Sequence, residues 1–181
     1  MTSGDRAQGA LGLWQAALRG VRSVLRTPTP TPPPRRPTPR RGAPGGYAGD
    51  APDVPELTYA PVADDQADPG EIVWAWVPFE EDHSQGKDRP VLVVGRRHGL
   101  LLGLMLTSKD HDRDAADEAR HGRSWVDIGA GAWDRRGRPS EVRVDRVLQL
   151  EPAAVRRGGG ALDRERFDRV ATAVRAVHPQ G

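Results

Sequence analysis

The sequence of 181 residues contains no cysteine and no asparagine, and only two of its 27 basic residues are lysine. Without cysteine the chain has no disulfide framework, no thiolate nucleophile and no cysteine-based metal site. This composition fits a reducing cytoplasm. No apolar run approaches the roughly 18 residues that a membrane-spanning helix needs.

Acidic residues are scarce at the N-terminal end. Residues 1–50 hold eight Arg and two Asp, a net charge of +6, whereas the other 131 residues hold 19 basic and 23 acidic residues, a net charge of −4. The pI of about 9.5 therefore reflects mainly the N-terminal segment. Any affinity of the folded part for nucleic acid must come from a local patch.

Three regions follow from the distribution of apolar residues and proline. Residues 1–26 predict a short basic amphipathic helix, because apolar residues recur at helical spacing. Residues 27–67 open with T-P-T-P-T-P-P-P-R-R-P-T-P-R-R, which favours polyproline II and predicts a disordered Pro/Arg-rich linker. Residues 68–181 contain the apolar runs expected of one compact domain. The apolar face of the predicted helix consists of Leu11, Trp14, Leu18, Val21 and Leu25.

The predicted N-terminal helix needs a surface to dock on, because an isolated helix of this length is marginally stable in water. A protein partner or a membrane surface would cover its apolar face. Membrane association is the less favoured role, and an irregular leader segment is the alternative to both.

Short strands dominate residues 68–181. The segment R-R-H-G between two apolar runs predicts a hairpin with Gly99 in its turn. Residues 109–123 are polar and predict a loop, and residues 129–140 predict a turn region. Asp163 is the expected N-cap of a C-terminal helix with Phe167 on its apolar face. The expected strands are Ile72–Val77, Pro90–Arg96, Leu100–Leu106, Ser124–Ile128, Glu141–Asp145 and Val147–Leu150.

This pattern predicts a mainly β fold of the α+β class, with accessory helices. Short strands separated by turn signals are typical of a small barrel rather than of βαβ units. A C-terminal helix packed on the barrel would close its open side.

Several polar residues lie where strands begin or end. Arg89 precedes Pro90 at the entrance of an apolar strand, where a phosphate can approach, although a surface arginine fits the same position. Thr107 and Ser108 follow the run L-L-L-G-L-M-L, and their hydroxyls either donate to a phosphate oxygen or cap the next turn.

The tetrapeptide V-R-V-D places Arg143 and Asp145 on one face of the predicted strand. Guanidinium groups bind phosphate in a bidentate manner and stay charged, and a carboxylate can accept a proton. The pair is a candidate for acid–base or charge-stabilising chemistry on a phosphodiester. An exposed salt bridge is the alternative.

His83, Gln85 and Lys87 belong to the polar segment H-S-Q-G-K-D. His83 can donate to a ligand or carry a proton, or it can be an exposed loop histidine.

Q-G-K-D lacks the glycine and hydroxyl residues of a phosphate-cradling P-loop. D-x-D-x-D from Asp110 fails as a calcium loop, because Ala115 stands at its sixth position. No metal site is expected.

Four segments in this order resemble the PemK/MazF family of toxin endoribonucleases from type II toxin–antitoxin systems, over about residues 68–150. They are G-E-I-V-W, Q-G-K-D-R-P-V-L-V-V, L-T-S and S-E-V-R-V-D-R-V. The resemblance implies an SH3-like β-barrel, a homodimer, a cognate antitoxin and DNA binding together with that antitoxin. It also implies metal-independent cleavage of single-stranded RNA at short sequences, which leaves a 2′,3′-cyclic phosphate.

The resemblance also assigns roles to residues. It implies that Arg89, Thr107, Arg143 and Asp145 are catalytic, with the Arg and Asp of R-x-D acting as acid and base. Because a guanidinium releases its proton only above pH 12 or so, charge stabilisation is the safer role for Arg143. The residues expected to bind RNA are His83, Gln85, Lys87 and Ser108.

Two other functions stay open. Glu80, Glu81 and Asp82 place negative charge beside the expected phosphate site, as would suit a silent module that binds RNA or protein without cutting. A poison of a protein target such as DNA gyrase is the third reading, because a related toxin family shares the barrel.

Overall fold

The computed structural model describes residues 45–54, 56–108, 120 and 122–178. The predicted helix over residues 1–26, the linker up to residue 44 and the polar loop over 109–119 lie outside the described residues. None of the helices in the described ranges combines the length and the hydropathy needed to cross a bilayer.

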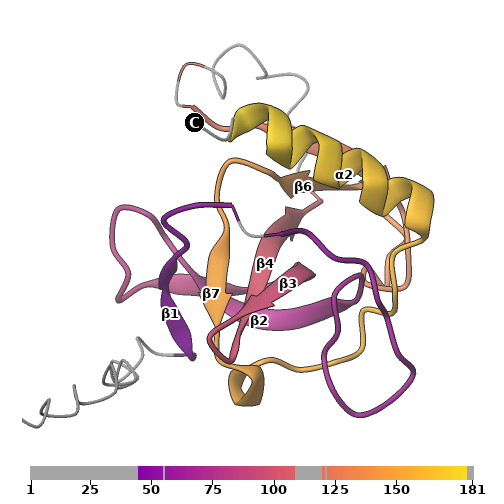
Figure 1. Ribbon diagram of the computed structural model, residues 1–181, viewed down its shortest axis with the longest axis horizontal. Coiled ribbons are helices and arrows are strands. Elements are labelled where there is room, and N and C mark those ends of the chain that lie inside the picture. The colour runs from indigo at the N-terminus through magenta and orange to yellow at the C-terminus, as the bar shows by residue number, and fades with distance from the viewer. Residues whose placement is uncertain (1–44, 55, 109–119, 121, 179–181) are drawn as a thin grey trace, which may run out of the picture. The chain divides into compact units, whose positions relative to one another are not determined.

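The described chain forms a curled antiparallel sheet followed by a helix (Figure 1). The strand order is β1-β7-β4-β3-β2, and β6 pairs with both β4 and β5. This mostly β half-barrel with one C-terminal helix confirms the predicted fold class. The elements are β1 (Tyr47–Asp50), β2 (Ile72–Pro78), β3 (Gly86–Arg97), β4 (Leu100–Thr107), β5 (Trp125–Gly129), β6 (Ser140–Arg143), β7 (Leu148–Leu150), the 3-10 helix η2 (Pro152–Ala154) and α2 (Arg164–Val177).

Strand β3 is buried on both of its faces. Successive side chains of a strand point to opposite sides, and here Leu92 and Val94 join one hydrophobic cluster while Val91 and Val93 join another. The run V-L-V-V is continuous rather than alternating for this reason, because neither side of the curled sheet faces water at this point.

The predicted hairpin between the second and third apolar runs is confirmed. Arg97 pairs with Leu100, so His98 and Gly99 alone form the loop. Both have positive φ, 50° for His98 and 83° for Gly99. Two-residue loops with this backbone match the twist of the flanking strands, and glycine adopts the conformation without steric cost.

Helix α2 begins where the sequence predicts it. The Asp163 side chain accepts a hydrogen bond from the Arg166 backbone N–H at 2.9 Å and caps the first turn. Phe167, Val170 and Val174 are buried in the same hydrophobic cluster as Leu92 and Val94. The helix therefore covers one side of the sheet.

Strand β6 is shorter than predicted, ending at Arg143 rather than at Asp145. The Asp145 side chain accepts a hydrogen bond from the Ser124 backbone N–H at 2.8 Å. The Ser124 N–H therefore donates to a side-chain carboxylate instead of to a backbone carbonyl of the neighbouring strand. The neighbouring strand β5 accordingly begins at Trp125 rather than at Ser124.

The prediction that residues 27–67 form a disordered linker is wrong for the C-terminal part of that range. Strand β1 lies inside the predicted linker and pairs with β7, and Tyr47 is only 3% exposed. Further along, the Tyr59 hydroxyl donates to the Leu162 carbonyl at 2.9 Å. This strand has little local signal, because Y-A-G-D is short and its glycine weakens strand propensity. Its pairing partner is β7, 98 or more residues later in the sequence, as in Asp50 with Leu148.

We expect Tyr47→Ala to lower the free energy of unfolding by about 3 kcal/mol, since a large aromatic side chain leaves the core. The matched control is Val62→Ala in the same segment, because Val62 is 51% exposed and its truncation should change stability by less than about 0.5 kcal/mol. Urea unfolding followed by tryptophan fluorescence measures both. Equal, small effects would show that this segment adds nothing to the domain.

Candidate functional site

Strands β3 and β4 separate at one end of their ladder. The last pair on this side is Val91 with Met105. Beyond it, β3 continues along β2 and carries Arg89, whereas β4 turns to β6, where Thr107 lies opposite Glu141. Arg89 and Thr107 therefore stand on the two sides of the point where the strands diverge.

Two cavities open at this divergence, and Arg89 and Thr107 line both of them. We call the smaller one, of about 260 Å³, the small cleft. We call the larger one, of about 870 Å³, the arginine pocket. The polar side chains of the small cleft include Glu80, Arg89, Thr107, Arg123, Arg143 and Arg146. The arginine pocket contains Trp74, Arg89, Arg135, Arg136, Arg138, Arg156 and Arg157.

Arg89 is half-buried, and its guanidinium makes no hydrogen bond or ion pair with a residue in the described ranges. Burial lowers its pKa below the ordinary value, yet an arginine stays protonated at neutral pH. A partly desolvated cation without a carboxylate partner is suited to bind an anion through a bidentate contact.

Thr107 is the last residue of β4 and is 9% exposed. Ser108 follows it, is exposed, and lines the arginine pocket only. The structure thus brings two predicted site residues, Arg89 and Thr107, to one place and sets Ser108 at its edge. A hydroxyl here can donate to a phosphate oxygen held by Arg89.

Arg143 is held by two carboxylates. Its Nε and Nη2 donate to Asp145, with Nη2 to Oδ2 at 2.7 Å, and Nη2 also donates to Glu80 Oε1 at 2.7 Å. Burial by itself lowers the pKa of Arg143, but the hydrogen bonds to Asp145 and Glu80 outweigh burial and raise it. The Arg143 side chain is 8% exposed, so the predicted pair is a buried ion pair and not an exposed one.

Asp145 and Glu80 occupy different sides of Arg143. Glu80 lines the small cleft, whereas Asp145 lines neither cavity. Both oxygens of Asp145 accept hydrogen bonds, from Arg143 and from the Ser124 backbone. Burial raises the pKa of Glu80, but the hydrogen bond and charge of Arg143 hold it below its usual value. Glu80 is therefore an anion that faces the cleft at neutral pH.

Three predicted RNA-binding residues, from the loop between β2 and β3 and from the start of β3, do not line these cavities. His83, Gln85 and Lys87 are exposed, and none lines the small cleft or the arginine pocket. Gln85 donates to Asp82 at 2.8 Å, and the Lys87 ammonium lies 5.7 Å from the Phe79 ring centroid. These contacts order the loop itself.

Glu80, Arg123 and Arg146 line the small cleft but were not predicted as site residues. Arg146 is 5% exposed and donates to Asp50 and to the Pro78 carbonyl, both at 3.0 Å. Its position after V-R-V-D was the available signal. The contacts of Glu80 and Arg123 depend on the fold, because Glu80 meets Arg143 across 63 residues.

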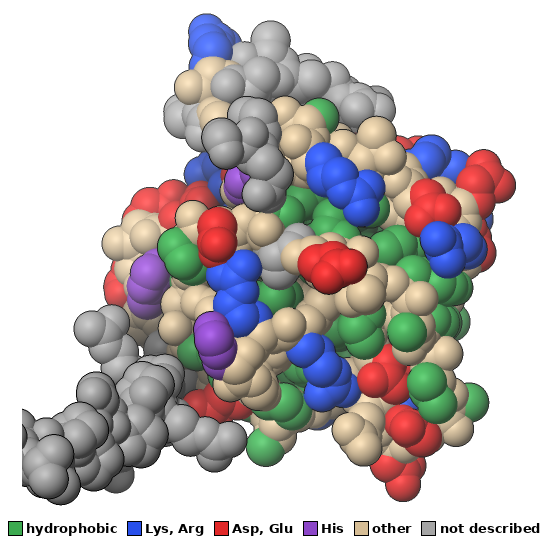
Figure 2. Space-filling model, in the orientation of Figure 1, with side chains coloured by type: hydrophobic (Ala, Val, Ile, Leu, Met, Phe, Trp, Pro, Cys, Tyr) green, Lys and Arg blue, Asp and Glu red, His purple; other side chains and the backbone are tan. Residues whose placement is uncertain are grey.

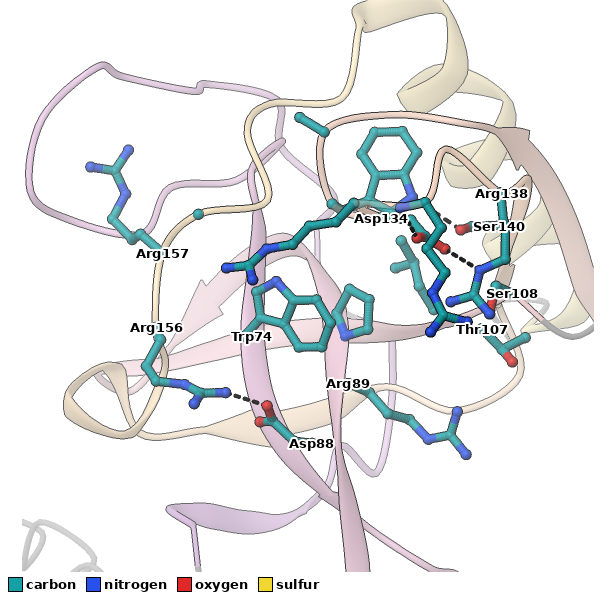
Figure 3. A pocket seen from close by; sticks show the side chains of 17 residues that line it. Trp74, Asp88, Arg89, Thr107, Ser108, Asp134, Arg138, Ser140, Arg156 and Arg157 are labelled. Atoms are coloured by element: carbon teal, nitrogen blue, oxygen red, sulfur yellow. Dashed lines mark hydrogen bonds and ion pairs between the residues drawn. The ribbon is translucent and has the colours of Figure 1, made fainter.

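The arginine pocket was also not predicted. Figure 3 shows Trp74 in the pocket, with Arg156 and Arg157 on one side and Thr107 and Ser108 on the other. On the face shown in Figure 2, basic and acidic side chains are interspersed and form no single basic surface. Within the arginine pocket, by contrast, six arginines stand against two aspartates among the described residues.

Carboxylates and histidines are spread through the described part of the domain without forming a metal centre. Among the residues that the structure describes, His, Asp and Glu side chains form no group of three or more that could hold a metal ion. The chemistry available at the cleft consists of guanidinium groups, hydroxyls and carboxylates.

Comparison with known proteins identifies the family. The family model described as "PemK-like, MazF-like toxin of type II toxin-antitoxin system" matches residues 68–178. This match spans the strands β2 to β7 and helix α2, including every residue of both cavities. No match was found among curated proteins. The chain belongs to the PemK-like, MazF-like toxins of type II toxin–antitoxin systems.

Proposed function

We propose that this toxin is a metal-independent, sequence-specific endoribonuclease that cleaves single-stranded RNA. The observation that carries the proposal is the convergence of Arg89, Thr107 and Arg143 on the small cleft. A phosphodiester is an anion with several acceptor oxygens, and these three side chains supply two cations and a hydroxyl around one space.

In the proposed reaction, the 2′-OH of the RNA attacks the adjacent phosphorus. The bond from the 2′-oxygen to phosphorus forms, and the bond from phosphorus to the 5′-oxygen breaks. A base accepts the 2′-hydroxyl proton and the leaving 5′-oxygen gains a proton, so the products are a 2′,3′-cyclic phosphate and a 5′-hydroxyl. Charge builds up on the non-bridging oxygens in the transition state.

Arg89 and Thr107 would hold the non-bridging oxygens. Arg143 would stabilise the developing charge rather than donate a proton, because its raised pKa makes it a poor acid. Asp145 is the proposed base, although both of its oxygens accept hydrogen bonds before RNA binds. For Asp145 to act, the bound phosphate must draw Arg143 toward the cleft and release a carboxylate oxygen.

Other properties of the family belong to this proposal. Membership in a type II toxin family implies an antitoxin partner. We propose in addition that the toxin works as a homodimer in the cytoplasm, where its RNA substrate lies, and that it binds DNA together with the antitoxin.

A second function has one observation in its favour. The Glu80 carboxylate occupies Arg143 Nη2, a donor that a phosphate would need. A protein in which this contact persists would bind RNA or a protein without cutting it. The experiments below separate this silent module from the enzyme.

We expect the purified full-length protein to cut a long unstructured RNA in EDTA at a recurring short sequence, leaving 2′,3′-cyclic phosphate ends. Arg89→Ala should lower the rate by a factor of about 100 or more, because a preorganised charge at the phosphate is lost. Arg164→Ala is the control, since Arg164 is an exposed residue of α2 that pairs with Asp168. Sequencing of fragment ends gives the sites. A folded protein that binds RNA but leaves it intact would support the silent module.

We expect Asp145→Asn to abolish cleavage and Glu80→Gln to retain it with tighter RNA binding. Glutamine removes a negative charge that competes with phosphate for Arg143, whereas Asp145→Asn removes the base. Single-turnover cleavage and RNA binding distinguish the two variants. Circular dichroism serves as the folding control, because breaking the buried pair of Arg143 costs on the order of 3 kcal/mol. Loss of cleavage in Glu80→Gln would transfer the role of base to Glu80.

A further inference from the structure

Most of the positive charge of the arginine pocket lies outside the small cleft, since Arg89 is the one arginine among the described residues that lines both. Six arginines line it, against two aspartates. Each aspartate is already paired with one of them: Arg138 Nε donates to Asp134 at 2.8 Å, and Arg156 bonds to Asp88 (Figure 3). Four guanidinium groups are therefore left without an acidic partner from the pocket itself.

Two of these four cations, Arg157 and Arg89, already have another role. Arg157 donates to the buried Glu71 at 2.8 Å, and Arg89 belongs to the proposed scissile-phosphate site. The guanidinium groups of Arg135 and Arg136 make no hydrogen bond or ion pair with any residue that the structure describes. Both lie in the turn region between β5 and β6. Asp134 lies close enough to Arg136 for their charges to interact, but the two side chains form no ion pair, so two adjacent cations line the pocket with only partial neutralisation.

The pocket also offers an aromatic surface. Trp74 of β2 is half-buried, and its backbone is fixed by hydrogen bonds with Arg156 at 2.6 and 2.8 Å. The pairing of these two segments fixes the Trp74 backbone at the wall of the pocket. Indole rings stack on nucleobases of any sequence, and arginines beside them bind the backbone phosphates.

We propose that the arginine pocket binds the nucleotide adjacent to the scissile phosphate, with its base on Trp74 and its phosphate on Arg135 and Arg136. This inference rests on the proposed function, because the two cavities share Arg89 and Thr107. A single-stranded RNA bound at the small cleft would therefore continue past Arg89 and Thr107 into the arginine pocket.

The size and shape of the pocket favour a nucleotide over an isolated anion. Its volume of about 870 Å³ lies within the roughly 300–1,000 Å³ of ligand sites. A small anion would need one or two arginines and would not use Trp74. A flexible single strand fills the space with a base and places its charge along the row of arginines.

The test is fluorescence anisotropy with a fluorescein-labelled single-stranded RNA of mixed sequence, 2′-fluoro-substituted so that it cannot be cleaved. The full-length Arg135→Ala/Arg136→Ala variant should bind about tenfold more weakly at low salt. Its log–log salt slope should fall by about 0.7, which is the contribution of one neutralised phosphate of a single strand. Trp74→Leu should weaken binding by about tenfold, and Trp74→Phe should retain it by keeping an aromatic face.

The matched control is Arg164→Ala/Arg169→Ala, which removes the same charge from the exposed face of α2, where both arginines pair with acidic residues. Equal affinity and equal salt slope in the pocket variant and in this control would overturn the inference. The inference would also be wrong if Trp74→Leu left RNA affinity unchanged and polyglutamate of the same total charge displaced the RNA. That result would identify a surface that binds any polyanion.

The same experiment separates this inference from the proposed function. If the wild-type protein cuts unmodified RNA and the pocket variants bind RNA like the control, the proposed endoribonuclease function is supported and the proposed nucleotide site is wrong. If the wild-type protein neither binds nor cuts RNA, both fall together.

Discussion

The site depends on the point where β3 and β4 part. Their hairpin is tied together through buried apolar side chains on both sides of the sheet, so its register cannot slip without exposing a whole face. After Val91 and Met105, however, β3 follows β2 and β4 follows β6. The divergence leaves a space that no strand fills. Arg89 and Thr107 border this space, which explains why one pair of residues lines two cavities.

Within that space, electrostatics divides the arginines into two groups. Arg143 is compensated by Asp145 and Glu80, and Arg146 by Asp50, so their charges are held in the protein. Arg89 and Arg135 have no such compensation among the described residues, and Arg136 has only the nearby charge of Asp134, without an ion pair. A phosphate entering the cleft therefore meets a free cation at Arg89 but must compete with Glu80 for Arg143. This competition links affinity for the substrate to the position of one carboxylate.

Much of the fold could be predicted from short-range pattern. The apolar runs, the H-G turn and the Asp163 cap are all local signals, and each element lies close to its predicted place. Strand β1 escaped prediction because its stability comes from β7 and from the burial of Tyr47, not from its own four residues. The early end of β6 escaped because a side chain, Asp145, replaces a ladder partner.

Local pattern places particular residue types at the strand ends, and it was enough to identify Arg89, Thr107 and the R-x-D pair as candidates. The balance of their charges, in contrast, follows from the packing of distant segments. Glu80 reaches Arg143 across 63 residues, Asp145 lines neither cavity, and Trp74 lines a pocket together with arginines from three other parts of the chain. Ion pairs and cavities are properties of distances in space, and these become fixed only when separate strands pack together.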